Sequence, residues 1–92
     1  MNALYAVFYS NQAKKFIERK ADAQLKERLL LLQRALEINP VPAKDYDLRK
    51  IEGESDYYRI RLSSYRVQYR VKQVEKEIHV LKIEKRDETT YK

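Results

Sequence analysis

Four arginines lie within the stretch DYYRIRLSSYRVQYRV, which spans residues 56–71. They are Arg59, Arg61, Arg66 and Arg70. After its first residue, Asp56, the stretch contains no acidic side chain. The planar, permanently charged guanidinium group of arginine suits phosphate, which it binds through two parallel hydrogen bonds. We therefore expect a phosphate-binding surface here, with a solvated basic surface that only aids solubility as the alternative.

The distribution of charge along the chain supports the first interpretation. The 92 residues carry 20 Lys and Arg against 14 Asp and Glu, a formal net charge of +6. Residues 1–56 hold ten basic and nine acidic residues, whereas residues 57–92 hold ten and five. The excess of positive charge therefore lies in the second half of the chain, and it indicates a phosphate-rich partner such as nucleic acid.

Composition excludes several other classes of protein. A chain of 92 residues is expected to form one domain over its full length. It has no cysteine and one histidine, which excludes a disulfide framework and a Cys-ligated zinc site and fits a reducing cytoplasm. No apolar run approaches the length of a membrane span and no secretory signal is visible. We expect a cytoplasmic protein without metal or cofactor.

Alternating apolar and polar side chains predict a β-hairpin within the arginine stretch. Residues 57–62 and 65–71 form its strands, and Ser63 and Ser64 form a two-residue turn. Across such a turn Arg61 lies opposite Arg66. Like charges directly opposite one another destabilise a strand pair, and neither strand offers a carboxylate to relieve them.

The same hairpin places the other arginines. Arg59 shares the face of Arg61, and Arg70 lies further along, near Tyr57, which could stack on a base. A preorganised anion site is consistent with this arrangement. The remaining tyrosines of the hairpin are expected in the core: Tyr58, Tyr65 and Tyr69.

The rest of the chain predicts an α+β fold. Residues 3–9 form a strand, and Ser10 or Asn11 caps a helix that runs to Lys20. Asp22 caps a second helix with an apolar stripe that ends before Pro40. A short strand near residues 48–51 and a final strand over EIHVLKIEK complete the pattern. We expect a strand, a two-helix hairpin and then a mostly antiparallel sheet with the helices on one face. The apolar stripe of the second helix is Leu25, Leu29, Leu32 and Leu36.

Two segments of the chain resemble the RelE group of bacterial and archaeal toxin–antitoxin systems, within the RelE/ParE superfamily. The first is KIEGESDYYRIRLSSYRVQYRV, with a K-I-x-G segment, an aromatic residue, two basic residues two apart, and Tyr-Arg-hydrophobic-x-Tyr after the turn. The second is KIEKRDETTYK, with Lys-Arg at the end of the last strand and a tyrosine a few residues on. The resemblance covers nearly the whole chain.

This resemblance implies an endoribonuclease that cuts messenger RNA in the ribosomal A site. The ribose 2′-OH attacks the adjacent phosphate and no metal is needed. Arg61 and Arg66 would stabilise the transition state, and Arg59 would orient the nucleotide. Arg86 would steady the leaving 5′ oxygen or the phosphate, and Tyr91 would stack on a base or activate the 2′-OH. The implied RNA-binding residues are Tyr57, Arg70 and Lys85.

One departure from the family affects the proton acceptor. Some members carry lysines where Arg59 and Arg61 stand, and lysine, unlike arginine, can lose its proton and act as a base. Either Tyr91 takes the proton, or catalysis is mainly electrostatic and positional, or this enzyme is slow. His79 lies inside the last strand and is expected to be structural. Two glutamates before the hairpin, Glu52 and Glu54, are weaker candidates for the proton acceptor.

The resemblance also implies partners. The ribosome and mRNA are the targets, and an acidic RelB-type antitoxin would dock an amphipathic helix on the toxin. Leu30 and Leu31 point away from the centre of the leucine stripe and are expected to be partly exposed. Two alternatives stay open: a ParE-like inhibitor of DNA gyrase, and a catalytically decayed toxin homologue that only binds RNA.

Overall fold

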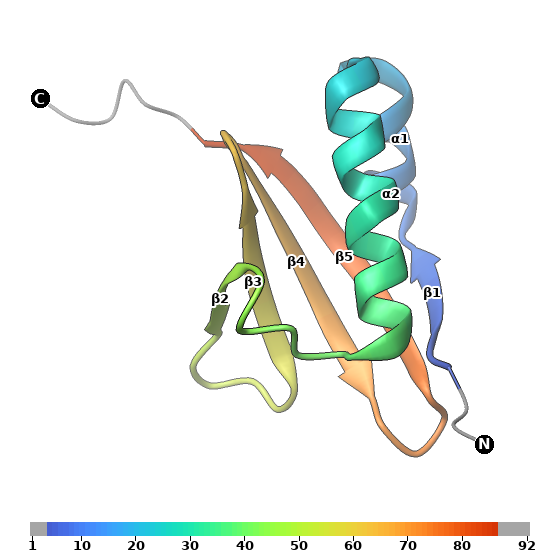
Figure 1. Ribbon diagram of the computed structural model, residues 1–92, viewed down its shortest axis with the longest axis vertical. Coiled ribbons are helices and arrows are strands. Elements are labelled where there is room, and N and C mark those ends of the chain that lie inside the picture. The colour runs from blue at the N-terminus through green and yellow to red at the C-terminus, as the bar shows by residue number, and fades with distance from the viewer. Residues whose placement is uncertain (1–3, 87–92) are drawn as a thin grey trace, which may run out of the picture.

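A computed structural model describes residues 4–86 and shows two helices packed on one face of a single five-stranded sheet (Figure 1). The α+β fold class is therefore confirmed. In chain order the elements are β1 (Ala6–Tyr9), α1 (Asn11–Lys20), α2 (Ala23–Ile38), β2 (Asp47–Lys50), β3 (Tyr57–Leu62), β4 (Tyr65–Lys72) and β5 (Glu77–Lys85).

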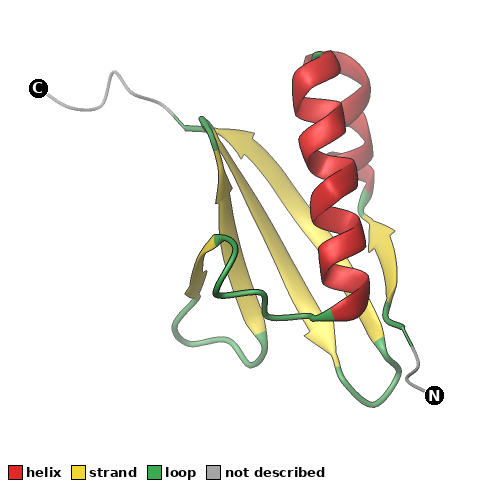
Figure 2. Cartoon of the chain, in the orientation of Figure 1, coloured by secondary structure: helices red, strands yellow, loops and turns green. Residues whose placement is uncertain are grey.

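The strands lie in the order β1-β5-β4-β3-β2. β1 runs parallel to β5, and the other neighbouring pairs are antiparallel, as the sequence predicts (Figure 2). The last strand thus has a neighbour on each side, which explains its apolar composition. The two helices connect the edge strand β1 to the far side of the sheet, and β2, β3 and β4 return towards it.

Both predicted helix caps are present. The Ser10 hydroxyl accepts a hydrogen bond from the backbone N–H of Ala13 at 3.1 Å and donates one to the Leu81 carbonyl at 2.7 Å. The Asp22 carboxylate accepts from the N–H of Leu25 at 2.8 Å. Each cap satisfies an N–H group that the first turn of a helix leaves without a partner. Because Ser10 also bonds to β5, the start of α1 is tied directly to the sheet.

The core forms between the helices and one face of the sheet. The predicted leucine stripe of α2 is buried throughout, and Tyr69 is completely buried, with its hydroxyl donating to the Pro40 carbonyl at 2.8 Å. The opposite face of the sheet carries no helix from the described part of the chain (Figure 1). No helix of residues 4–86 is long and apolar enough to cross a membrane. The buried sheet residues are Ile60, Leu62, Val67, Tyr69, Val71, Ile78, Val80 and Ile83.

The bounds of two strands differ from the predicted ones, by one residue for β2 and by more for the start of β1. β1 begins at Ala6, because the backbone N–H of Tyr5 bonds to the Glu37 carbonyl at the end of α2 rather than to a strand. The start of the predicted strand, at residue 3, lies outside the described residues. β2 spans Asp47–Lys50, one residue earlier than expected.

Candidate functional site

The face of the sheet that points away from the helices carries the arginines. On β3 and β4 the residues buried against the helices alternate with a second set. Side chains of successive strand residues point to opposite faces, so this second set lies on the open face. We call these six residues the arginine face: Tyr57, Arg59, Arg61, Arg66, Gln68 and Arg70.

The predicted register of the hairpin is confirmed. Arg61 pairs with Arg66, and Tyr57 pairs with Arg70. The turn at Ser63 and Ser64 is tight, with Ser63 in the left-handed region at φ 55°. Side chains directly opposite in an antiparallel pair have their Cβ atoms about 5 Å apart. The guanidinium groups of Arg61 and Arg66 can therefore reach the same phosphate group.

As predicted, neither strand of the hairpin supplies a carboxylate to Arg61 or Arg66, and their acidic partners lie on the neighbouring strands β2 and β5. Arg61 Nε lies 3.6 Å from Asp47 Oδ2 on β2. Arg66 Nη1 lies 3.8 Å from Glu84 Oε2 on β5. These pairs are long and about half exposed, so each contributes at most about 1 kcal/mol and a phosphate can replace the carboxylate.

The other two arginines differ sharply in their surroundings. Arg70 Nη2 lies 2.7 Å from Glu54 Oε1, and the Arg70 guanidinium lies 5.3 Å from the centre of the Tyr57 ring. No ion pair joins Arg59 to any carboxylate of residues 4–86. Arg59 is thus the arginine of the hairpin whose charge is least compensated.

A hydrogen-bonded chain runs across the middle of the arginine face. The Tyr57 hydroxyl donates to Gln68 Oε1 at 2.9 Å, and Gln68 Nε2 donates to Glu84 Oε2 at 3.4 Å. Glu84 Oε1 also lies 3.5 Å from Lys82 Nζ. These contacts restrict the side chains between the arginines and reduce the reorganisation needed when an anion binds.

Arg86 lies beside the hairpin turn. Its backbone N–H donates to the Ser64 carbonyl at 2.6 Å, which extends the β4–β5 pairing by one step beyond Lys85. The end of the last strand is therefore fixed next to the turn that joins Arg61 to Arg66. The expected proximity of Arg86 to the paired arginines follows from this hydrogen bond.

Lys85 does not lie on the arginine face, although the family resemblance groups it with Tyr57 and Arg70 as an RNA-binding residue. It pairs with Tyr65, whose ring packs edge-on against Phe16 of α1, on the side of the helices. There Lys85 lines an open hollow of about 320 Å³ together with Phe16, Lys20 and Tyr65. Strand alternation, which sends neighbouring side chains to opposite faces, separates Lys85 from Glu84.

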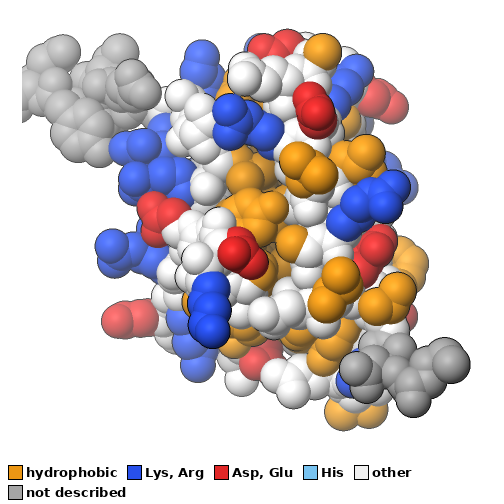
Figure 3. Space-filling model, in the orientation of Figure 1, with side chains coloured by type: hydrophobic (Ala, Val, Ile, Leu, Met, Phe, Trp, Pro, Cys, Tyr) orange, Lys and Arg blue, Asp and Glu red, His pale blue; other side chains and the backbone are white. Residues whose placement is uncertain are grey.

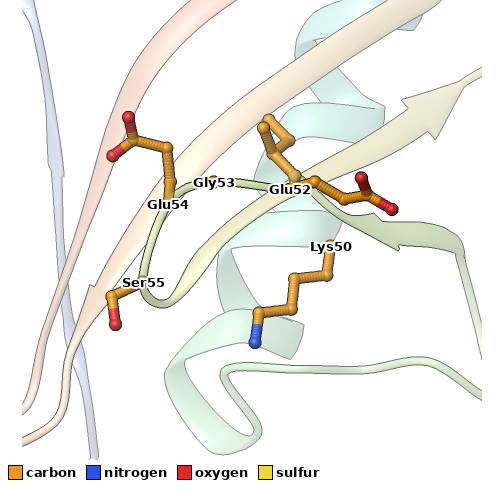
Figure 4. A pocket seen from close by; sticks show the side chains of 6 residues that line it. Lys50, Glu52, Gly53, Glu54 and Ser55 are labelled. Atoms are coloured by element: carbon orange, nitrogen blue, oxygen red, sulfur yellow. The ribbon is translucent and has the colours of Figure 1, made fainter.

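The loop between β2 and β3 carries the two weaker candidates for the proton acceptor. Glu52 and Glu54 flank Gly53, whose φ of +85° is a conformation that other residues rarely adopt. Their carboxylates point away from one another, so they form no carboxylate pair (Figure 4). Glu54 is held by Arg70 instead. Within residues 4–86 no three His, Cys, Asp or Glu side chains are grouped so as to hold a metal ion.

This geometry can be compared with known proteins. The family model described as ParE toxin of type II toxin–antitoxin system, parDE, matches residues 7–90. The chain belongs to the RelE/ParE superfamily of toxins.

Two archaeal proteins place the toxin closer to RelE. RelE1 of Methanocaldococcus jannaschii, a toxin candidate, is 36% identical over 52 residues, a match that spans 56% of this chain and 58% of that protein. A toxin chain with 36% identity and a TM-score of 0.80 comes from the archaeal RelE–RelB complex of Pyrococcus horikoshii OT3. That match covers 92% of this chain and 98% of the other. The protein is a RelE-type toxin of a toxin–antitoxin system.

The isolated RelE toxin of E. coli shares the fold. Its TM-score is 0.71 at 24% identity, with 90% of this chain and 85% of the other covered. The RelE-type toxin thus shares its fold with solved RelE structures.

Burial rules out Tyr69 as a proton acceptor, and other titratable side chains of the hairpin and β5 are engaged in structural contacts. Burial, and next the neighbouring Tyr58, raise the pKa of Tyr69 far above its ordinary value, so this hydroxyl stays protonated. His79 Nε2 lies 2.8 Å from Glu77 Oε1, and its ring is stacked on Phe8, so it is engaged in contacts within the sheet. Tyr58 and Tyr65 pack against the core, as predicted.

The open face of the toxin also carries basic residues that the sequence did not indicate as part of the site. Arg49 of β2 pairs with Arg59, and Lys82 of β5 pairs with Gln68. Both extend the positive surface across neighbouring strands, and the carboxylates of Asp47 and Glu84 lie among these basic side chains. Alternation within β2 could have indicated Arg49, but only the strand order shows which strand lies beside β3. Tyr91 lies outside the described residues.

Proposed function

We propose that this RelE-type toxin is a ribosome-dependent endoribonuclease of the cytoplasm that cuts mRNA in the A site. One observation carries the proposal: Arg61 and Arg66 lie opposite one another on the open face, with Arg86 fixed beside their turn. Three permanently charged side chains at one end of a sheet form a surface suited to a phosphate that gains negative charge.

The bond changes of the proposed reaction take place within the RNA backbone, and the ribosome presents that backbone to the toxin. The 2′ oxygen forms a bond to the adjacent phosphorus while the bond from phosphorus to the 5′ oxygen of the next nucleotide breaks. The 2′-OH proton passes to an acceptor, the leaving 5′ oxygen gains a proton, and a cyclic phosphate remains. Arg61 and Arg66 hold the phosphoryl oxygens, Arg59 orients the nucleotide, and Arg86 supports the leaving oxygen.

Arginine cannot serve as the proton acceptor. We assign that step to Tyr91, which can also stack on a base. Tyr91 lies five positions after Arg86 in the chain, and a fully extended segment of that length spans at most about 18 Å. This reach includes the paired arginines beside the Ser64 turn. If Tyr91 only stacks, catalysis by this toxin is electrostatic and positional.

The test is a translation reaction programmed with a defined mRNA, with cleavage mapped by primer extension. We expect cuts within the codon in the A site, and no cuts in the same mRNA without ribosomes. Intact mRNA on ribosomes stalled with an open A site would show that the proposal is wrong. RNA binding without cleavage would identify a decayed toxin instead.

The family model favours a second candidate, because it describes ParE toxins. A ParE-like toxin would inhibit DNA gyrase by protein binding and cleave nothing. A supercoiling assay with purified gyrase distinguishes the two activities. Loss of supercoiling with intact mRNA would favour the ParE-like function, and the substitutions Arg61→Ala and Arg66→Ala would then leave toxicity unchanged.

We also propose an acidic RelB-type antitoxin as partner, as in the solved archaeal RelE–RelB complexes. Leu30 and Leu31 are 50% and 56% exposed, as expected, and hydrophobic side chains reach the surface on the helix side of the molecule (Figure 3). Leu30 borders a hollow of about 220 Å³ lined by both helices and Tyr9. An amphipathic helix could bury these leucines while its acidic face meets the basic residues of α1.

Binding assays with the cognate antitoxin can locate this contact. Leu30→Asp is expected to weaken binding at least tenfold, because it places a charge in the apolar hollow. Val74→Asp, at a position that is 93% exposed in the β4–β5 turn, is the matched control. Equal affinities of the two variants would show that the antitoxin docks elsewhere.

A further inference from the structure

A transverse row of four flat side chains crosses the open face of the sheet. Phe8 of β1 pairs with His79 of β5, His79 pairs with Arg70 of β4, and Arg70 pairs with Tyr57 of β3. Each residue is the direct neighbour of the next, so the row runs across four adjacent strands. With strands about 4.8 Å apart, it is roughly 14 Å long. We call it the stacking row.

The members of the stacking row contact one another in two pairs. The rings of Phe8 and His79 are stacked, with their centroids 5.2 Å apart and their planes at 25°. The Arg70 guanidinium lies over the Tyr57 ring at 5.3 Å. Phe8 is nevertheless 45% exposed, and no helix of residues 4–86 covers it. The Phe8 ring is therefore partly accessible from solvent on the open face of the sheet.

Polar contacts hold the row in place. Glu77 binds His79 at 2.8 Å, Glu54 binds Arg70 at 2.7 Å, and the Tyr57 hydroxyl donates to Gln68. Arg70 Nε is buried and has no hydrogen-bond partner within residues 4–86. The row is therefore largely preorganised. Ligand binding to such a surface loses little side-chain entropy.

We propose that the stacking row binds the unpaired bases of single-stranded RNA next to the arginine face. Aromatic rings, imidazole and guanidinium planes are the groups on which proteins stack unpaired bases. RNA is favoured over an acidic peptide because the row is continuous with Arg59 and the paired arginines, which suit phosphates. This inference rests on the proposed function and adds Phe8 and His79, two residues outside the arginine hairpin, to its RNA site.

The position of the row indicates which nucleotides it binds. Tyr57 and Arg61 are four residues apart on β3, which corresponds to about 13 Å along the strand. Bases on the stacking row therefore belong to nucleotides that flank the cut, not to the cut itself. Stacking tolerates every base, so the row contributes affinity and alignment rather than sequence preference.

The experiment measures RNA binding without ribosomes and without cleavage. The probe is a 2′-O-methyl oligonucleotide of twelve nucleotides with a single 2-aminopurine, titrated with the full-length toxin. Stacking quenches 2-aminopurine, and fluorescence anisotropy gives the affinity. We expect Phe8→Ala and His79→Ala to weaken binding about 5- to 100-fold and to remove the quench. Phe8→Leu, which retains an apolar side chain without a ring, should behave like Phe8→Ala, and Val74→Ala should resemble the unsubstituted toxin.

An abasic oligonucleotide of the same length separates stacking from phosphate binding. The unsubstituted toxin should prefer the base-bearing probe, and Phe8→Ala should reduce that preference. Equal binding of both probes by the unsubstituted toxin would overturn the inference. So would a Phe8→Ala variant that binds RNA normally and loses only the antitoxin, because the face would then be a protein-docking surface.

The outcomes distinguish this inference from the proposed function. If the toxin quenches the probe but cuts no ribosome-bound mRNA, the stacking row stands and the ribonuclease proposal fails. If the toxin cuts mRNA in the A site and Phe8→Ala binds the probe normally, the ribonuclease proposal stands and the stacking row fails.

Discussion

Replacing Arg66 by alanine is expected to slow mRNA cleavage about 100- to 1,000-fold. In enzymes, removal of one preorganised donor from a developing negative charge has effects of this size. Arg66 lies opposite Arg61 and next to Glu84 on β5, so its guanidinium group is held where a phosphate would bind. The reduction should appear in the rate of the bound complex, because the interaction strengthens as charge develops.

The same substitution should leave the fold intact. The Arg66 side chain is 39% exposed, and its ion pair with Glu84 is worth between 0.2 and about 1 kcal/mol at such a surface. Removal of Arg66 also removes the repulsion from Arg61 directly opposite, worth about 0.2–1 kcal/mol. The two effects oppose one another, so the free energy of unfolding should change by less than about 1 kcal/mol. A loss of cleavage then cannot be attributed to unfolding.

The assay uses stalled ribosomes with a defined codon in the A site and an excess of toxin, so that single-turnover rates are measured. Arg34→Ala, an exposed position on α2, is the matched control and should cleave normally. Arg66→Lys keeps the charge but loses the planar fork, and should be intermediate. If Arg66→Ala cleaves within threefold of the unsubstituted toxin, Arg66 does not stabilise the transition state.

Three further predictions concern the scaffold and the charge of the site. Ser10→Ala removes a helix cap and a hydrogen bond to β5, and should lower the free energy of unfolding, measured in urea, by about 1–2 kcal/mol. Ser55→Ala, in an exposed loop, is the control. Equal stabilities of the two variants would contradict the role of the cap. Because burial raises the pKa of Tyr69, the unfolded chain ionises first as the pH rises above about 10, and stability should fall there by up to about 1.4 kcal/mol per pH unit for this group. Tyr69→Phe should make that alkaline decline shallower, and an unchanged slope would refute the assignment. Glu84→Gln removes a negative charge beside Arg66 and should tighten RNA binding a few-fold, and added salt should reduce this gain. A 100-fold loss of cleavage with unchanged affinity for RNA would instead identify Glu84 as a proton acceptor.

Most of the fold could be predicted because its signals are local. The alternation in the arginine stretch and the short Ser63–Ser64 turn specify the hairpin and its register within sixteen residues. Ser10 and Asp22 mark the helix starts because each accepts a hydrogen bond from an N–H group three residues on. The start of β1 was wrong because Tyr5 bonds to Glu37, a residue 32 positions away, and no local pattern indicates that contact.

The sequence predicted only part of the candidate site, because the rest depends on contacts between residues that are distant in the chain. The sequence by itself determined that Arg61 and Arg66 oppose one another, since a tight turn joins them. Only the tertiary structure decided which carboxylates compensate them, because Asp47 and Glu84 lie on β2 and β5, and the pairing of these strands with β3 and β4 sets which side chains meet. A strand pattern shows which side chains share a face, but not which strand lies alongside.

Lys85 and Phe8 show that nearness in the sequence does not determine which side chains share a surface. Lys85 precedes Arg86 in the chain, yet strand alternation turns it towards α1 and away from the arginines. Phe8 lies more than 60 residues before His79 in the chain, yet parallel pairing of β1 with β5 stacks the two rings. The residue types that favour RNA binding were present in the sequence, and the order of the strands assembled them into one surface.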